Sequence, residues 1–282
     1  MTAVTNDEIL KRLEEEGKKE GFDPKFLEFY QRLLRTQTLF EQRLDKPKPS
    51  LSDKAARERL EHGLPLISFN ELTLDWSLLQ EVFNEVTATF ADFPELFGEI
   101  PQNLKEVFKA TFTKEAVKEW FEEAKLPDAI ASGEVNKRLL EAIIHATLRP
   151  FLTSQAKALL GFVKQEHWRH SYCPICGGSP DFAFLDKEIG ARWLLCSRCD
   201  TEWLFQRLEC PYCGNNDQNT LAYFTDDKGL YRLYVCEQCH TYIKAIDLRH
   251  AQSEVLLPLE RITTVDIDRQ GQEKGYQPSH SR

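Results

Sequence analysis

The sequence predicts an α+β protein in which a helical N-terminal domain is followed by two tandem β modules. Two observations lead to this prediction. The residues before His167 contain no cysteine and carry apolar side chains at helical spacing, whereas all eight cysteines follow in four C-x-x-C pairs among short alternating segments. We therefore expect a helical domain over residues 1–165, a first four-cysteine module over 166–208, and a second module with a C-terminal tail over 209–282.

The first predicted helix covers residues 24–44, because apolar residues recur there at steps of three and four and a proline begins the stretch. Residues 45–50 contain two prolines, which remove backbone donors, so this segment is predicted to be a linker. A long helix is also predicted over residues 134–160, where Pro150 is expected to kink or split it.

Two further helices are predicted to begin at capping residues. Asp75 precedes the apolar pattern of residues 76–90, and Thr113 precedes that of residues 116–121. The apolar faces of these helices are expected to form the core of the N-terminal domain.

The cysteine-rich part of the chain repeats itself. Residues 173–177, Cys-Pro-Ile-Cys-Gly, recur 37 positions later as Cys-Pro-Tyr-Cys-Gly at 210–214. Five further residues recur 40 positions later: Asp186, Arg192, Cys196, Cys199 and Thr201 correspond to Asp226, Arg232, Cys236, Cys239 and Thr241. Two alternating segments around a polar turn predict a β-hairpin over 181–195 in the first repeat and over 221–235 in the second.

Each hairpin is predicted to bring two C-x-x-C loops side by side, which supplies the four thiolates of a structural zinc site or of a rubredoxin-type iron site. The duplication favours pairing within each repeat, and a cross-brace that pairs the first loop with the third is the alternative. A four-thiolate site leaves no open coordination position, so we expect scaffold or electron-transfer centres and no hydrolytic ones. The predicted ligands are Cys173, Cys176, Cys196 and Cys199 for one ion, and Cys210, Cys213, Cys236 and Cys239 for the other.

We predict structural roles for other residues beside the C-x-x-C loops. Gly177 and Gly214 are expected to let backbone N–H groups turn toward the sulfur atoms. His167, His170 and His240 also lie beside the loops, but eight thiolates suffice for two ions, so we predict no histidine ligand.

Charge argues against a polyanionic partner, because the chain has a net charge of -9. Residues 166–282 contain 13 Lys and Arg against 17 Asp and Glu, whereas a nucleic-acid-binding ribbon normally has a basic surface. The N-terminal residues lack the basic and apolar segments of an export signal, and no later run approaches the roughly 18 apolar residues that span a membrane. We expect a cytoplasmic protein without nucleic-acid binding or membrane insertion.

The sequence also lacks the common catalytic motifs, including a Gly-rich phosphate loop, G-x-S-x-G and H-E-x-x-H. We therefore predict no catalytic residue and no enzymatic activity.

A few polar and aromatic residues follow the second and fourth C-x-x-C loops, and two interpretations of them are open. They can belong to strands with the aromatic side chains inward and the charges solvated. Alternatively, they form a surface that binds a partner protein, for which Trp and Arg are typical anchors. The residues of this predicted partner surface are Glu202, Trp203, Arg207, Tyr242 and Lys244.

Several of these segments together resemble the formate dehydrogenase accessory protein family FdhE. The segments are 173–177, 190–199, 201–203, 210–214 and 236–244, and the tail over 259–268 is similar as well. The resemblance is close from Trp168 to Tyr276 and looser in the helical part, through residues 29–37 and 63–66. It implies two rubredoxin-like modules that bind iron through the C-x-x-C motifs.

The resemblance also implies a function. A protein of this family would bind the immature catalytic subunit of a respiratory formate dehydrogenase in the cytoplasm and assist its assembly before export. The leading hypothesis is therefore a maturation factor with two tetrathiolate-bound metal ions, iron by resemblance and zinc as the alternative. Two other functions remain: a nucleic-acid-binding zinc ribbon, which the charge disfavours, and a small iron-thiolate redox protein.

Overall fold

The computed structural model describes residues 5–18, 23–47, 51–124, 126 and 134–278. It divides into two compact units. The first contains Met1–Lys48 and Ser68–Gln155, and the second contains Pro49–Ile67 and Ala156–Arg282. The first unit is helical and the second contains a mixed sheet, so the predicted α+β class is confirmed.

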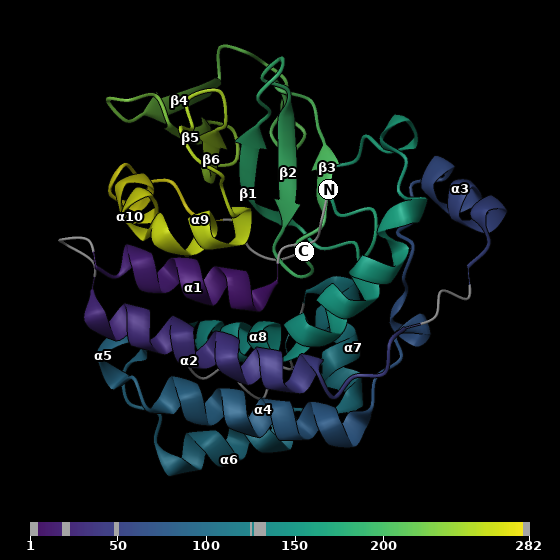
Figure 1. Ribbon diagram of the computed structural model, residues 1–282, viewed down its shortest axis with the longest axis vertical. Coiled ribbons are helices and arrows are strands. Elements are labelled where there is room, and N and C mark those ends of the chain that lie inside the picture. Colours follow the sequence, from purple (N-terminus) through teal and green to yellow (C-terminus); the bar gives the residue numbers. More distant parts are fainter. Residues whose placement is uncertain (1–4, 19–22, 48–50, 125, 127–133, 279–282) are drawn as a thin grey trace. The chain divides into compact units, whose positions relative to one another are not determined.

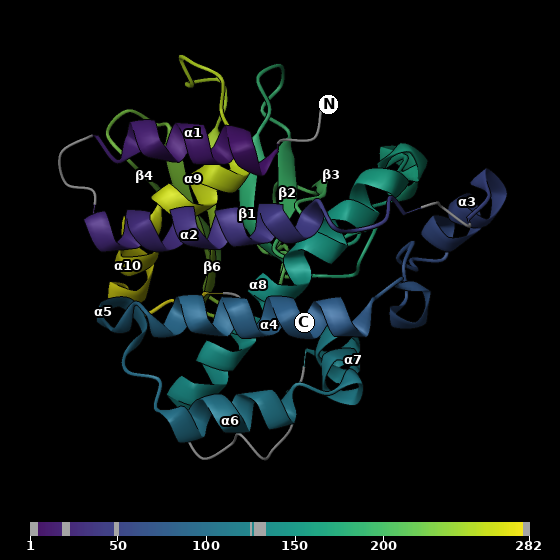
Figure 2. The ribbon, with the colours of Figure 1, turned by 60° about the horizontal axis from the view of Figure 1, so that its bottom comes forward.

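Three helices of the first unit, α1 (Asn6–Glu16), α2 (Pro24–Glu41) and α4 (Trp76–Ala91), lie side by side with α2 in the middle (Figures 1 and 2). Phe29 of α2 is buried, and its ring centroid lies 5.0 Å from that of Phe90 in α4. The apolar stripe predicted for residues 24–44 therefore faces the core of this unit. The unit also contains η1 (Phe69–Glu71), α5 (Pro94–Phe97), α6 (Gln102–Thr111), α7 (Lys114–Glu123) and most of α8 (Glu134–Leu159).

Capping residues begin two of these helices, as the sequence predicts. Asp75 Oδ1 accepts the backbone N–H of Leu78 at 3.1 Å, and Thr113 Oγ1 accepts that of Ala116 at 3.2 Å, so α4 and α7 start directly after these residues. Helix α2 ends at Glu41, a few residues before the predicted end. Of the predicted linker over 45–50, residues 45–47 are not helical and residues 48–50 lie outside the described residues.

Helix α8 runs from Glu134 to Leu159 without interruption, and Pro150 lies inside it, so the expected split does not occur. Proline has no N–H, which leaves the carbonyl oxygen four residues earlier, that of Ala146, without its helical donor. Gln37 of α2 supplies a donor, because its buried Nε2 donates to Ala146 O at 2.8 Å. This hydrogen bond explains how the helix continues through the proline and why a glutamine is buried.

The second unit is built on a single six-stranded sheet in the order β3-β2-β1-β6-β5-β4 (Figure 1). Each repeat supplies three consecutive antiparallel strands, and the parallel pairing of β1 with β6 joins the two repeats. The predicted tandem modules therefore share one sheet. Its strands are β1 (Pro180–Leu185), β2 (Arg192–Cys196), β3 (Glu202–Leu204), β4 (Leu221–Thr225), β5 (Tyr231–Cys236) and β6 (Thr241–Asp247).

Two helices that the sequence analysis did not predict, α9 (Leu257–Thr263) and α10 (Val265–Glu273), cover one face of this sheet. Leu257 packs in an apolar cluster with Phe182, Phe184, Leu195 and Ile246, and Ile267 packs against a second cluster around Leu233, Val235 and Tyr242. Helix α10 lies close to β6, since a Cβ at Gly271 would be 2.9 Å from the ring of Tyr242 in that strand. Glycine is therefore required where α10 crosses β6.

The second unit also includes a segment from the N-terminal half of the chain, which differs from the domain range 1–165 predicted from sequence. Backbone N–H groups of Leu66 and Ile67 donate to Pro174 O and Ile175 O, both at 2.9 Å, in the first C-x-x-C loop. These bonds attach the segment to the cysteine-rich unit. The segment contains α3 (Asp53–Glu61), and the unit continues through η3 (Leu160–Phe162) and η4 (Gln165–His167).

Among the residues that the structure describes, no helix is both long and apolar enough to span a lipid bilayer.

Candidate metal centres

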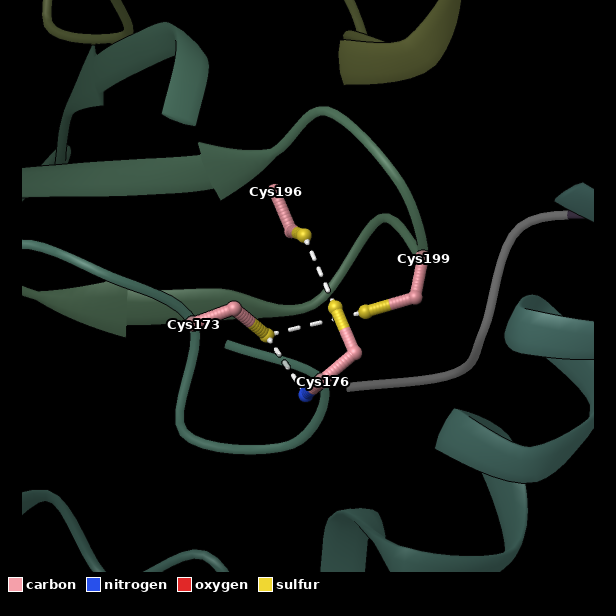
Figure 3. A group of neighbouring side chains, drawn as sticks. All are labelled: Cys173, Cys176, Cys196 and Cys199. Atoms are coloured by element: carbon pink, nitrogen blue, oxygen red, sulfur yellow. Dashed lines mark hydrogen bonds between the residues drawn. The ribbon is translucent and has the colours of Figure 1, made fainter. Parts of the chain in front are cut away.

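The four cysteines of the first repeat converge where β1 begins and β2 ends (Figure 3). Cys173 Sγ lies 3.6 Å from Cys199 Sγ, and Cys176 Sγ lies 3.5 Å from Cys196 Sγ. These distances are much longer than the roughly 2.05 Å of a disulfide, and all four cysteines are free and buried. We call this group centre 1.

The second repeat builds an equivalent group, which we call centre 2. Cys210 Sγ lies 3.7 Å from Cys239 Sγ, and Cys213 Sγ lies 3.7 Å from Cys236 Sγ. The structure therefore groups the cysteines within each repeat, as the duplication predicts, and not in a cross-brace among the described residues.

Both groups fit a tetrahedral metal ion. A zinc–sulfur bond of about 2.3 Å places the sulfur atoms of a tetrahedron about 3.8 Å apart. The shortest sulfur–sulfur distances are 3.5–3.7 Å, and all ligand atoms within each group lie within 4.8 Å of one another. Each group can therefore hold one metal ion, and the geometry suits zinc and iron alike because both accept four thiolates.

Backbone and side-chain donors surround the sulfur atoms of centre 1. The N–H groups of Ile175 and Cys176 point to Cys173 Sγ at 3.4 and 3.5 Å, and the N–H of Arg198 points to Cys196 Sγ at 3.4 Å. Thr201 Oγ1 lies 3.1 Å from Cys199 Sγ. Such donors stabilise the negative charge that thiolates carry when they bind a metal ion.

Two further polar side chains that the sequence analysis did not select also lie beside the centres. Asn215 Nδ2 donates to Cys236 Sγ at 3.4 Å in centre 2. At centre 1, Arg198 is 1% exposed and packs close enough to Cys196 that a Cβ at Gly178 would contact both side chains. A buried guanidinium at this position offsets part of the charge of four thiolates. The sequence signal that points to them is their position, since Arg198 lies inside the second C-x-x-C loop and Asn215 follows the third by two residues.

All four C-x-x-C loops end with the same backbone conformation. Gly177 and Gly214, which follow the first and third loops, have φ of 73° and 72°. Asp200 and His240 follow the second and fourth loops and adopt φ of 57° and 52°, although neither is glycine. The position after the second cysteine therefore requires the left-handed conformation in every loop. His240 has a backbone role here and is not among the ligand atoms of centre 2.

Several of the thiols have shifted pKa values in the protein without metal. At centre 1, burial raises the pKa of Cys173 and Cys199, whereas hydrogen bonds from Cys173 and the other thiols lower the pKa of Cys176. At centre 2, burial raises the pKa of Cys210. Burial also acts to raise the pKa of Cys236, but the Asn215 amide and backbone N–H groups lower it to about 7. Without a cation, four adjacent thiols cannot all ionise, which is why a metal ion is needed to assemble each tetrathiolate.

The two centres differ in their access to solvent. All four cysteines of centre 1 are buried, whereas at centre 2 Cys213 is exposed and Cys239 is half-buried. Chelators, oxidants and partner molecules therefore reach centre 2 more readily than centre 1.

Arg192 of the first repeat positions a loop of the second. This residue is 3% exposed, and its guanidinium donates to the carbonyl oxygens of Gln206 and Glu209, immediately before Cys210. The guanidinium also lies over the Phe205 ring, 5.2 Å from its centroid. The first repeat thus holds the chain that enters centre 2.

The structure buries three of the five residues of the predicted partner surface. Trp203 is 0% exposed and its Nε1 donates to His170 O at 3.0 Å, and Tyr242 is buried against α10. Lys244 is also buried, and its Nζ lies 2.6 Å from Asp268 Oδ2 and donates to Arg261 O at 3.1 Å. These three residues belong to the interior, because other segments of the second unit cover their side chains. Glu202 is half-buried and Arg207 is exposed, so direct contact with a partner stays a prediction for these two.

Comparison with known proteins shows which proteins this chain resembles. Residues 172–207, which contain all of centre 1, match the family profile described as FdhE, central domain. A protein FdhE homolog of Aquifex aeolicus is 41% identical over 140 residues, which cover 46% of this chain and 49% of the relative. These matches confirm the predicted resemblance to the FdhE family.

More distant FdhE proteins extend this likeness. The protein FdhE of Escherichia coli is 24% identical over 136 residues, which cover 47% of this chain and 44% of that protein. The crystal structure of the FdhE protein from Pseudomonas aeruginosa superposes with a TM-score of 0.59 at 21% identity, and the match covers 98% of this chain and 92% of that one. The fold is thus shared along nearly the whole chain. The sequence matches span less than half the length of these curated FdhE relatives.

Proposed function

We propose that this chain is an accessory factor that helps a formate dehydrogenase to mature. The observation that carries the proposal is the pair of four-sulfur centres on a shared sheet in a chain that resembles FdhE proteins. Four protein ligands would leave a bound ion no position for a substrate or a water nucleophile. Such centres suit a protein that binds a client better than one that transforms a small molecule.

Each centre would hold one metal ion, and we propose iron in the cell, with zinc as the alternative. A tetrathiolate ion would crosslink the C-x-x-C loops, and iron would add one-electron redox chemistry. The surrounding protein groups have their own roles. The N–H donors and Asn215 would stabilise the thiolates, and Arg192 would hold the chain that leads into centre 2.

The client in this proposal is the immature catalytic subunit of a formate dehydrogenase, bound in the cytoplasm before export. Support comes from the resemblance to FdhE proteins and from the hydrogen-bonded six-stranded sheet, because a preformed surface loses less entropy when it binds a partner. Glu202 and Arg207 follow the second C-x-x-C loop and are the remaining candidates for contact from the predicted surface.

The test is affinity capture of the full chain from its native cell under anaerobic conditions, with metal analysis of the same sample. We expect the catalytic subunit of a formate dehydrogenase in the captured material and two metal ions per chain. A variant with Cys196→Ser and Cys236→Ser, which removes one ligand from each centre, is the control and should capture little. A metal-loaded chain that captures no formate dehydrogenase subunit would contradict the proposal.

A small redox protein is the second candidate, because Cys213 exposes centre 2 to solvent. An electron donor or acceptor could then approach this centre closely. An iron-thiolate absorption spectrum with reversible reduction would favour this function, and a colourless protein loaded with zinc would exclude it.

A further inference from the structure

The two outer edges of the sheet differ in whether other groups cover their outward-facing backbone. At the β3 edge, the backbone N–H of Leu204 donates to Gln165 Oε1 at 2.9 Å, so a side chain covers this edge. At the other edge, within the residues that the structure describes, no strand pairs with the outer side of β4. Natural proteins usually protect such an edge with lysine, proline or a covering segment. Strand β4 contains neither proline nor a charged residue.

The register of β4 shows which backbone groups point outward. Glu237 N donates to Thr220 O at 2.9 Å, and Asp226 N donates to Tyr231 O at 3.3 Å. The residues just before and just after β4 therefore form their hydrogen bonds on the β5 side. Hydrogen-bonded and non-bonded pairs alternate along an antiparallel ladder. This alternation turns the N–H and C=O groups of Leu221, Tyr223 and Thr225 toward the open edge.

The internal repeat shows what kind of segment such an edge accepts. Strand β1 is the counterpart of β4 in the first repeat, since Leu185 pairs with Arg192 just as Thr225 pairs with Arg232. The outer side of β1 is occupied by β6, which pairs in parallel, and Leu248 N donates to Leu185 O at 3.0 Å. In the second repeat the place of this parallel strand is open.

Side chains beside the open edge add apolar contact area. Tyr223 is 51% exposed and Phe224 is 40% exposed, and because side chains alternate along a strand they project from opposite faces of the sheet. A cation accompanies each ring: Arg232 Cζ lies 4.9 Å from the Tyr223 centroid and Lys274 Nζ lies 4.5 Å from the Phe224 centroid. An apolar segment would bury both rings, and a carboxylate in it could pair with Lys274.

We propose that β4 binds an extended, mainly apolar segment of the client protein as a seventh, parallel strand. This inference rests on the proposed function, because it assumes that the client is the formate dehydrogenase subunit. Main-chain hydrogen bonds at Tyr223 and Thr225 supply the pairing, and the two exposed rings select apolar side chains at neighbouring positions of the segment, one on each face of the sheet. A client that is still unfolded offers such segments, whereas a mature one has buried them, so this edge favours the immature form.

The test replaces an outward N–H by proline. Thr225→Pro removes a donor that faces the open edge while the bonds to β5 remain, and Thr225→Ala is the matched control that keeps the donor. Affinity for the purified immature subunit, and for overlapping synthetic peptides that cover its sequence, should fall about tenfold for Thr225→Pro and stay unchanged for Thr225→Ala. Metal content and thermal unfolding of each variant report whether the fold is intact.

Hydrogen exchange on the unmodified chain gives a second measurement that needs no variant. The amides of Tyr223 and Thr225 should become protected when the immature subunit is added. Equal capture by folded Thr225→Pro, or unchanged exchange at both amides in the complex, would overturn the edge proposal and leave the proposed function standing. Failure of the unmodified chain to bind either the subunit or its peptides would overturn both. Self-association that Thr225→Pro abolishes would identify a second copy as the occupant and also overturn the edge proposal.

Discussion

Gln37 is the residue that allows a proline inside α8. Its buried Nε2 donates to Ala146 O, the carbonyl that Pro150 leaves without a helical donor. We expect Gln37→Leu to lower the free energy of unfolding by about 1–3 kcal/mol, because it leaves this buried carbonyl unsatisfied. Chemical denaturation of the metal-loaded chain measures the effect.

Pro150→Ala provides the matched background, because alanine restores the N–H that can bond to Ala146 O within the helix. Gln37→Leu should therefore lower the free energy of unfolding less in the Pro150→Ala chain than in the unmodified chain. An equal decrease in the free energy of unfolding in both chains would show that the glutamine does not compensate for the proline.

Asp247 is a second buried polar residue with a defined role. Its carboxylate is 0% exposed, and its Oδ2 lies 2.7 Å from both Arg232 Nη2 and Arg249 Nη2 and 3.8 Å from His250 Nε2. Burial acts to raise the pKa of Asp247, but the hydrogen bonds from Arg249 and the charge of Arg232 outweigh it and hold the pKa below its ordinary value. Asp247→Asn should lower the free energy of unfolding at neutral pH by about 3 kcal/mol, since it removes the charged partner of Arg232, whose side chain is only 11% exposed.

The pH dependence of this loss has a definite sign. A carboxylate whose pKa is lowered by folding stabilises the native state fully above its unfolded pKa of about 4, and this contribution is lost as the pH falls through the lower folded pKa. The stability difference between the unmodified chain and Asp247→Asn should therefore be constant from pH 7 to about pH 5 and shrink below about pH 4. A difference that instead grows in acid would contradict the assigned direction of the pKa shift. Comparison of the two proteins at each pH cancels any metal loss that they share.

At the scale of the elements, the four C-x-x-C loops are alike in backbone but differ in surroundings. The first two lie in the interior, whereas the third and fourth leave Cys213 exposed and Cys239 half-buried. Access to solvent, and not ligand type, therefore distinguishes the two centres.

We expect a strong chelator to remove the metal ion of centre 2 before that of centre 1. Two single variants isolate the centres: Cys236→Ser should keep only the ion of centre 1 and release it slowly, and Cys196→Ser should keep only that of centre 2 and release it fast. Metal analysis during the chelator reaction gives both rates. Loss of both ions from either variant, while the chain stays folded, would show that the centres depend on each other.

At the scale of the whole molecule, the residues attached to the metal centres do not form a single stretch of sequence. The segment Pro49–Ile67 belongs to the second unit, because Leu66 and Ile67 donate to carbonyls of the first C-x-x-C loop and Tyr172 Oη donates to Gly63 O at 2.7 Å. A boundary near residue 165 would leave this segment without those partners.

Removal of both metal ions should therefore affect this segment together with the sheet. Metal binding supplies much of the folding free energy of small metal-bound β modules. Hydrogen exchange of the full chain after chelation should rise in Pro49–Ile67 and in the sheet, and should change little in α2 and α4. Unchanged exchange in Pro49–Ile67 would assign this segment to the helical unit instead.

The sequence by itself determined the features that depend on neighbours in the chain. The spacing of the C-x-x-C pairs identified the cysteines of both centres, and the alternation between them identified the hairpins. Capping residues such as Asp75 and Thr113 marked the starts of α4 and α7. These features are predictable because a loop, a hairpin or a helix start is specified by a few consecutive residues.

Only the tertiary structure decided which surfaces meet. It joined the repeats through parallel pairing of β1 with β6, buried Trp203 and Lys244, and let α8 continue through Pro150 because Gln37 lies beside it. It also exposed Cys213 and, within the described part of the chain, left one edge of β4 without a neighbouring strand, although the corresponding residues of the first repeat are buried or paired. The physical reason is that burial and strand pairing depend on residues far apart in the sequence, so two nearly identical local motifs can acquire different surroundings.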